Sequence, residues 1–490
     1  WMTSELISMI KEKSKAYKLH QQNESNIDLK NRFKLISARV KKAIRVQKVK
    51  YYSNLLDVNY LDSKKCWDII NETRGKKSKN KIEEICISGT KVSAEQDASL
   101  VAQEFNLFFT NVAEDLLRKS GTEQNMGEGN KEIKDQKLTF ITRTGNKLNT
   151  KICELSLTTG DIEKAIRALK NKSSVGADGL SATIIKENEE LFARILLPIF
   201  NKSLKRGVFP DLLKISILIP VFKSGESTQV NNYRPIALLP CIAKILEKCI
   251  KEKLLNYLNH IQFLAYEQHG FVKKRSTDTA LLTHITNIVE NIEKDDAAVG
   301  IYLDLAKAFD TVNHARLIKK LGGIGISGSL LQWFESYLNN RKQCVRINDT
   351  LSPKLMIKHG VPQGSVLGPL LFIIYINDMF SLPLKGKVLG YADDTSLLYN
   401  AESADKVNED FKHDETLLTL WFNENFLHLN ISKCRYIIYS YKAMVWEHNL
   451  KLQIGNKPLV RDNKYKYLGL LLDEKLIWRD HLLELRAKLR

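Results

Sequence analysis

The chain has 490 residues, 43% of them hydrophobic, so it can bury large cores in about two to four domains. It carries 75 Lys and Arg against 56 Asp and Glu, a formal net charge of +19. This excess favours a polyanionic partner, first of all nucleic acid, over a merely basic surface or an anionic membrane surface. The sequence shows no lipidation signal, no signal peptide and no apolar run of the ~20 residues that span a bilayer, so no membrane partner is expected.

The first 75 residues predict basic helices. A cluster of Lys and Arg at 41–50 is followed by Tyr51 and Tyr52. Such a cluster suits a phosphate-tracking surface with aromatic rings nearby, and it suits a solvated helix face equally well. Because the sequence begins with Trp1 instead of Met, and ends inside a helical pattern at Arg490, we expect a fragment of a longer polyprotein.

A short strand–turn–strand is predicted over residues 82–92, with Gly89 at the turn. Ser93 is then predicted to open a helix, with Gln96 completing a capping box. Residues 119–150 are poor in apolar side chains and rich in Gly, Asn, Glu and Lys, which predicts a flexible linker.

From Leu155 onward the pattern alternates between helices and short strands and favours an α+β fold. The predicted helices lie near residues 162–169, 242–258, 314–321 and 366–379. The predicted strands are 216–222, broken at Pro220, then 299–305, a hairpin over 388–399, and runs near 436–439 and 467–472.

The candidate chemistry lies in three aspartates. Asp393 and Asp394 occupy the turn of the 388–399 hairpin, where aspartate is by itself common for structural reasons. Asp304 ends the apolar run VGIYLDL, whose alternation puts Tyr302 and Asp304 on one face of a strand. A helix N-cap is the structural alternative for Asp304. Three converging carboxylates would instead form an oxygen-rich site for two Mg²⁺ ions, as nucleotidyl transfer requires.

A series of longer motifs is more specific. In chain order these are SVGADGLSATIIK (174–186), NNYRPIALLPCIAKILEKCI (231–250), QHGFVKKRSTDTAL (268–281), YLDLAKAFDTVNH (302–314), WFESYLNNRKQCV (333–345), GVPQGSVLGPLLFIIYIND (360–378), YADDTSLL (391–398), LNISKCRYIIYS (429–440) and YLGLLLD (467–473). From about residue 150 to the end, the sequence resembles the reverse transcriptases of jockey-like non-LTR retrotransposons. Such an ordered series is unlike a chance match to a single short motif.

The resemblance implies a right-hand polymerase fold. It places the fingers at 151–298, the palm at 299–440, and the end of the palm with the start of a truncated thumb at 441–490. Residues 1–118 would be a basic helical extension that precedes the polymerase. The upstream endonuclease and most of the thumb are expected to be missing.

The resemblance also assigns roles to individual residues. The catalytic and metal-binding set is Asp304, Asp393 and Asp394, with Leu305 as a further member of the metal site. The nucleotide-binding set is Lys223, Arg234, Phe309, Gln363 and Lys433, where Phe309 would exclude a 2′-hydroxyl. The template and primer set is Gly270, Arg275, Gly360, Gly364, Leu468 and Gly469. The implied cofactor is Mg²⁺, two ions, with Mn²⁺ as a substitute.

The implied partners are an RNA template, a DNA primer or target DNA, and dNTPs; the sequence does not identify any protein partners. The cysteines form no CxxC pair and no zinc spacing, so a reduced, intracellular chain is expected, with function in the nucleus. The sequence departs from the motifs at Lys433-Cys434, where relatives commonly have Lys-Thr, and at Val272, where they often have Arg or Lys.

Three alternatives stay open at this point. The chain could be a folded nucleic-acid-binding fragment that is silent because it is truncated. It could be a group II intron maturase, or an RNA-dependent RNA polymerase. The last usually has Gly-Asp-Asp where this chain has Ala392-Asp393-Asp394, and Phe309 also favours deoxynucleotides.

Overall fold

The chain divides into two compact units, Trp1–Lys81 with Leu489–Arg490, and Ile82–Lys488. The computed structural model describes residues 1–23, 26–58, 66, 69–70, 73, 82–119, 150–171, 175–295, 297–400, 402–440 and 449–489. The predicted linker over 119–150 therefore lies, apart from its two end residues, outside the described part of the chain. Within that part, none of the helices combines the length and the apolar character needed to cross a membrane.

The first unit contains two helices, α1 (Ser4–Gln22) and α2 (Ile27–Val58), as the sequence predicted. The Thr3 hydroxyl caps α1 by accepting a hydrogen bond from the Leu6 backbone N–H at 3.3 Å. The two helices contact each other through a few apolar and aromatic groups, including the Tyr17 and Phe33 rings, whose centroids are 5.3 Å apart.

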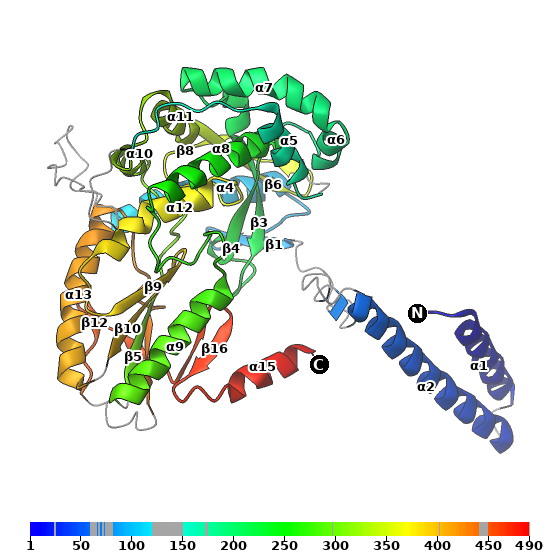
Figure 1. Cartoon of the computed structure of the whole chain (residues 1–490). Helices are drawn as coiled ribbons and strands as arrows, with labels where there is room; N and C mark the ends of the chain where they lie inside the picture. Colours follow the sequence, from blue (N-terminus) through cyan, green and yellow to red (C-terminus); the bar gives the residue numbers. More distant parts are fainter. Residues whose placement is uncertain are drawn as a thin grey trace. The chain divides into compact units, whose positions relative to one another are not determined.

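In the second unit, one five-stranded sheet has the order β14-β11-β5-β10-β9. Its strands β5, β9 and β10 are labelled in Figure 1. Its strands are β5 (Ala298–Leu303), β9 (Lys387–Tyr391), β10 (Asp394–Asn400), β11 (Arg435–Tyr439) and β14 (Val460–Arg461). Ile301 and Leu303 face the main core with α12 (Gly368–Ile376) and α13 (Ala404–Glu424). Tyr302 faces the opposite core with α9 (Thr277–Asp295), so the predicted alternation of this strand is confirmed.

A second sheet has the order β4-β3-β6-β7, with β8 also paired to β6. Its strands are β3 (Ile215–Phe222), β4 (Tyr233–Leu238), β6 (Arg341–Ile347), β7 (Thr350–Leu351) and β8 (Leu355–Ile357). The helix α4 (Ala98–Lys119) packs on this sheet, with the Phe105 ring 4.9 Å from the ring of Tyr233.

Two local predictions were wrong. Strand β3 runs through Pro220 without a break, because Pro220 pairs with Pro235 of β4 and lies beyond Leu218, the last residue that pairs with β6. No ladder hydrogen bond from the missing N–H is needed there. Helix α4 begins at Ala98 instead of following Ser93, which is the last residue of strand β2 (Thr90–Ser93). Asp97 caps the helix by accepting from the Leu100 N–H at 2.9 Å.

The compact units and sheets divide the chain differently from the predicted domains. Helix α4 belongs to the second unit, which begins at Ile82, whereas the predicted extension ends at 118. Strands β6 to β8 join the sheet of β3 and β4, although they fall within the predicted palm range 299–440. Which strands share a sheet is decided by hydrogen bonds between residues that are distant in sequence.

The remaining elements complete a mixed helix and sheet fold, in agreement with the α+β prediction. They are β1 (Glu84–Ile87), β2 (Thr90–Ser93), α5 (Thr159–Arg167), α6 (Ala182–Glu187), α7 (Glu189–Arg206), α8 (Cys241–His260), α10 (His314–Gly323), α11 (Gly328–Leu338), β12 (Gln453–Ile454), β13 (Lys457–Pro458), β15 (Lys464–Tyr467), β16 (Leu470–Asp473) and α15 (Arg479–Leu489), with short 3-10 turns at Asp211–Lys214, Val230–Asn232 and Asn377–Ser381.

Candidate active site

Three aspartates meet at one end of the sheet that contains β5. Strands β5 and β10 are antiparallel neighbours, and their last pair in this direction is Leu303 with Thr395. Asp304 and Asp394 are therefore the next residues on the two strands, and Asp393 lies in the adjoining turn. No helix begins at Asp304, because the next helix in the chain is α10 at His314, so the N-cap alternative does not apply.

The three carboxyl groups are close enough to affect one another. Burial raises the pKa of Asp393, and the Asp304 carboxylate raises it further. Asp394 has an exposed side chain, yet loss of hydration around its carboxyl group and then the charges of Asp393 and Asp304 raise its pKa to about 6. Each shift means that the unpaired negative charges are unfavourable where they stand, which is the condition that a bound cation relieves.

The turn that carries Asp393 is held by a neighbouring segment that the sequence did not reveal as a partner. The Gln268 side-chain oxygen accepts from the backbone N–H groups of Gly270 and Ala392, at 2.7 and 2.9 Å. A Cβ on Gly270 would lie 2.3 Å from the Ala392 nitrogen, so this position requires glycine for packing. Gly270, predicted to contact template or primer, thus directly supports the aspartate turn.

Several cations surround the aspartates. Lys433 Nζ lies 3.9 Å from an Asp304 carboxylate oxygen. Arg234 and Lys223 both lower the pKa of Asp393, which places their charges near it. Partial burial lowers the pKa of Lys223, and the like charges of Lys433 and Arg234 lower it further. These three predicted nucleotide-binding cations therefore gather beside the acidic cluster, where a triphosphate could neutralise their repulsion.

The backbone around Asp304 is fixed by the segment that precedes β11. The Asp304 carbonyl accepts from the Asn430 N–H at 2.8 Å, and its own N–H points to the Cys434 sulfur at 3.5 Å. Cys434 is the residue that departs from the common Lys-Thr motif. Its thiol is buried and contacts the backbone of the aspartate without contacting the carboxylate.

Phe309 lies half-buried five residues after Asp304. Its ring stacks on Phe372 of α12 at a centroid distance of 4.4 Å and meets Phe271 edge-on at 6.3 Å. The ring is thus anchored from the core side. An aromatic ring that is held in place by stacking can limit the space beside it.

The turn at Pro362-Gln363-Gly364 is tied to strand β4 and to the loop that follows β5. Gln363 donates through Nε2 to Asp310 at 2.8 Å, and its carbonyl accepts from Ala237 of β4 at 2.8 Å. Gly364 has a φ of 123°, and a Cβ there would lie 2.7 Å from the Ala237 carbonyl oxygen. Gly360 is equally restricted, by the Asp310 backbone at 2.7 Å. Both glycines are required by close backbone packing.

Other predicted residues lie in less direct positions. Arg275 donates through Nη1 to the backbone carbonyls of Ala265 and Tyr266, at 2.8 and 3.0 Å, so it braces its own loop. Its contact with template phosphate stays a prediction. Leu468 and Gly469 form the turn between β15 and β16, with φ values of 47° and 92°. Leu305 forms an isolated bridge with Leu429.

The side chains as they stand do not form a finished metal site. Among the residues that the structure describes, no group of three or more His, Cys, Asp or Glu side chains is arranged to hold a metal ion. The chemistry of the donor set nevertheless fits Mg²⁺, because the backbone brings three carboxylates to adjoining strand ends, where the Asp304 charge contributes to raising the pKa values of Asp393 and Asp394.

Asp310 gives a stability prediction. Burial raises its carboxyl pKa to about 6, above the ordinary aspartate value. The folded state then holds a proton more tightly than the unfolded state, so this group costs stability above pH 6 and the cost disappears as the pH falls to 4. Relative to the parent chain, the free energy of unfolding of Asp310→Asn is therefore expected to rise by up to about 3 kcal/mol as the pH goes from 4 to 7.

Urea unfolding of both chains across this pH range measures the difference. Asp349→Asn, in the exposed turn between β6 and β7, is the matched control. Its unfolding free energy should differ from that of the parent chain by the same amount at every pH. A constant difference for Asp310→Asn over the same range would contradict the assignment of a buried, proton-binding carboxyl group.

Comparison with known proteins identifies a protein family that this sequence matches. A sequence profile described as "Reverse transcriptase (RNA-dependent DNA polymerase)" matches residues 222–472, which contain the three aspartates. Similar curated proteins include a probable RNA-directed DNA polymerase from transposon BS of Drosophila melanogaster, 27% identical over 330 residues, covering 66% of this chain and 36% of the relative. The RNA-directed DNA polymerase from mobile element jockey of Drosophila funebris is 28% identical over 345 residues, covering 68% of this chain and 37% of the relative.

A probable RNA-directed DNA polymerase from transposon X-element of Drosophila melanogaster is 26% identical over 335 residues, covering 67% of this chain and 36% of the relative. The chain thus spans little more than a third of the length of these relatives.

Proposed function

Because this chain belongs to the reverse transcriptase (RNA-dependent DNA polymerase) family, we propose that it carries the nucleotidyl-transfer centre of a non-LTR retrotransposon polymerase. It would copy RNA into DNA by joining dNTPs to the 3′-hydroxyl of a primer. The observation that supports this most directly is the meeting of Asp304, Asp393 and Asp394 at adjoining strand ends, beside a cluster of cations.

In this proposal the two sheets are parts of a right hand. The sheet of β5, β9, β10, β11 and β14 is the palm, and the sheet of β3, β4 and β6 belongs to the fingers. Helix α15 (Arg479–Leu489) opens the thumb. The helices α1 and α2 belong to a basic extension that precedes the polymerase.

Asp304 and Asp393 would hold two Mg²⁺ ions, with Asp394 and the Leu305 backbone completing the site and Mn²⁺ able to substitute. Bound there, the ions would activate the primer hydroxyl and stabilise the leaving pyrophosphate. The chain itself contributes a rigid turn, which Gln268 fixes through the Ala392 N–H. This fixed turn keeps the carboxylates at the strand ends before substrate arrives.

The surrounding residues would bind the substrates. Lys223 and Arg234 would contact the triphosphate, and Gln363 would contact the nucleotide from the Pro-Gln-Gly turn. Phe309 would lie under the sugar and exclude a 2′-hydroxyl. The template and primer would pass by Gly360 and Gly364 and by the β15–β16 turn at Leu468 and Gly469. In the parent element the primer would be a nicked target DNA end in the nucleus.

A primer-extension assay tests the proposal, with an RNA template, a DNA primer and dNTPs, in Mg²⁺ and with the metal chelated. We expect metal-dependent extension. Salt-sensitive RNA binding without any extension would favour the second candidate, a silent nucleic-acid-binding fragment, which the net charge of +19 also fits. Incorporation of rNTPs as readily as dNTPs would instead indicate an RNA polymerase.

Lys433 gives a milder prediction than the aspartates. Its side chain is 57% exposed and its ammonium group lies 3.9 Å from an Asp304 oxygen, so water and salt can partly replace its charge. Lys433→Ala is expected to slow single-turnover extension by about 100-fold, the lower end of what one proton-transfer group contributes. Lys451→Ala, an exposed lysine on the loop before β12, is the control. A loss as large as that of an aspartate variant would contradict this auxiliary role.

A further inference from the structure

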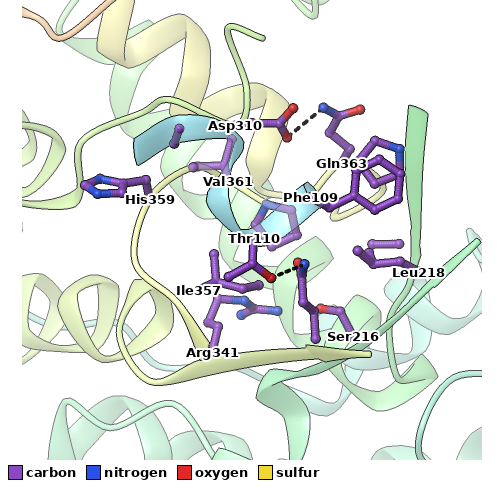
Figure 2. A pocket seen from close by; sticks show the side chains of 16 residues that line it. Phe109, Thr110, Ser216, Leu218, Asp310, Arg341, Ile357, His359, Val361 and Gln363 are labelled. Atoms are coloured by element: carbon purple, nitrogen blue, oxygen red, sulfur yellow. Dashed lines mark hydrogen bonds between the residues drawn. The ribbon is translucent and has the colours of Figure 1, made fainter. Parts of the chain in front are cut away.

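A narrow pocket, with about 50 Å³ of space for the centres of water-sized molecules and a mouth open to solvent, lies between α4 and the sheet of β3, β4 and β6 (Figure 2). Its lining combines apolar and polar groups from α4, from the three strands and from the loop that leads to Gln363. Gln363 and Gly360, to which substrate roles are proposed above, form one part of its wall, and no role is proposed above for the residues of α4, β3 and β6 that form the rest.

The pocket lies on the far side of β4 from the proposed nucleotide face. Side chains alternate along a strand, so Pro235 and Ala237 share one face of β4 and Arg234 and Ile236 share the other. Pro235 and Ala237 line the pocket, whereas Arg234 and Ile236 are exposed. A molecule in the pocket would therefore not contact the triphosphate-facing cations.

One lining residue is a buried cation with unused donors. The Arg341 side chain is only 1% exposed. Its Nη1 donates to the Tyr337 carbonyl at 3.2 Å, while Nε and Nη2 have no hydrogen-bond partner within the described part of the chain. The nearby acid Glu247 lies close enough for the Arg341 charge to lower its pKa, against the larger effect of burial. Its Oε2 accepts from the Val366 and Leu367 N–H groups and its Oε1 from the Tyr337 hydroxyl, so neither oxygen bonds to Nε or Nη2 of Arg341. Buried guanidinium nitrogens without partners are unusual.

The two Arg341 nitrogens without partners lie on the same edge of the guanidinium group. Nε and Nη2 make one edge of the guanidinium plane and present two parallel N–H groups, which match the two oxygens of a carboxylate. The Ser216 hydroxyl, also lining the pocket and buried, is likewise without a hydrogen-bond partner in the described residues. Figure 2 shows Arg341 and Ser216 toward one end of the pocket and Asp310, bonded to Gln363, toward the other.

The rest of the lining is largely apolar. Phe109, Leu218, Ile357 and Val361 contribute hydrocarbon surface between the two polar ends. We propose that this pocket binds a small carboxylic acid with a flat, apolar body, whose carboxylate pairs with the Nε and Nη2 edge of Arg341 and accepts from Ser216. A planar hydrocarbon body suits walls of this kind.

Isothermal titration calorimetry on the whole chain tests this site, with benzoate as the probe. Benzamide is the uncharged isostere, and acetate lacks the apolar body. We expect benzoate to bind and both comparison molecules to bind at least about 10-fold more weakly, as loss of a charged pair or of a buried ring implies. Because the readout is binding of benzoate, its failure leaves the polymerase proposal untouched, and the reverse also holds.

Two variants locate the binding. Arg341→Met removes the paired edge, and Ala113→Leu fills the pocket from α4 without touching any charge; each is expected to weaken benzoate at least 10-fold. Arg346→Met, on the same strand but outside the lining, is the matched control and should stay within twofold of the parent chain. Ala113→Leu keeps the test valid if Arg341→Met does not fold.

Three outcomes would overturn the proposal. The first is no heat of binding up to 20 mM benzoate, about as weak as a specific carboxylate pair can be, which would mean that the pocket holds water only. The second is equal affinity for benzoate and benzamide. The third is benzoate binding that a folded Ala113→Leu variant leaves unchanged, which would place the binding elsewhere on the chain.

Discussion

Asp393→Asn is expected to reduce primer extension on an RNA template at least about 1,000-fold, since metal-ion stabilisation of such a reaction is worth several kcal/mol. Asparagine keeps the size of the side chain but cannot supply the negative charge that a divalent ion needs. The same change should raise the melting temperature near pH 7, because burial and the charge of Asp304 raise the pKa of Asp393 and so make its ionised form unfavourable in the fold.

This combination of lost activity and gained stability separates a functional role from simple damage. Single-turnover extension and thermal unfolding are measured on the same preparation, and RNA binding is checked at two salt concentrations. Asp405→Asn, in the exposed first turn of α13, is the control and should retain extension. Asp393→Asn that still extends primers within 10-fold of the parent chain would rule out the proposed catalytic centre.

Sequence patterns predicted the framework of this site well because they report short-range geometry. The alternation in VGIYLDL predicted the opposite faces of Ile301 and Tyr302, and the hairpin pattern placed Asp393 in a turn. A strand has a period of two whatever surrounds it. The register that makes Asp304 a neighbour of Asp394 is a long-range property, and the sequence supported it only through the family resemblance.

The supports of the site were harder to predict. Gln268 bonds to the Ala392 N–H across 124 positions of the chain, and although it opens the motif QHGFVKKRSTDTAL, the local sequence does not indicate which distant backbone group it contacts. The same limit applies to charge. The contact of Arg275 with a template phosphate stays a prediction, and the sequence did not predict that its guanidinium also donates to carbonyls of its own loop. The sequence shows where a Lys or Arg occurs in the chain, but it does not show the direction of the side chain in the folded structure.

Pro220 shows how context overrides a local signal. Proline inside a predicted strand normally indicates a break or an edge, because it cannot donate a hydrogen bond. Here the strand continues, since Pro220 pairs with Pro235 and β6 no longer pairs with β3 at that point. A rule based on one residue could not include the second proline, which lies 15 positions later on the neighbouring strand.

Phe309→Val is expected to reduce discrimination against rNTPs by roughly 100-fold while retaining dNTP incorporation, the size of effect that a lost steric contact gives. The ring is half-buried and stacked on Phe372 at 4.4 Å, so it cannot easily move aside for a 2′-hydroxyl. Valine removes the outer part of that wall. The measurement is the ratio of kcat/KM for a dNTP and for the matching rNTP.

The support beneath the ring provides a second, graded test. Phe372→Leu removes the stacked partner and leaves Phe309 in place, so discrimination should fall by less than in Phe309→Val. Phe411→Leu, a buried phenylalanine of α13, is the control: it costs packing energy but lies outside the stack and should leave the ratio unchanged. If all three variants lowered the ratio equally, general loosening of the core would explain the effect, and Phe309 would have no specific role in choosing the sugar.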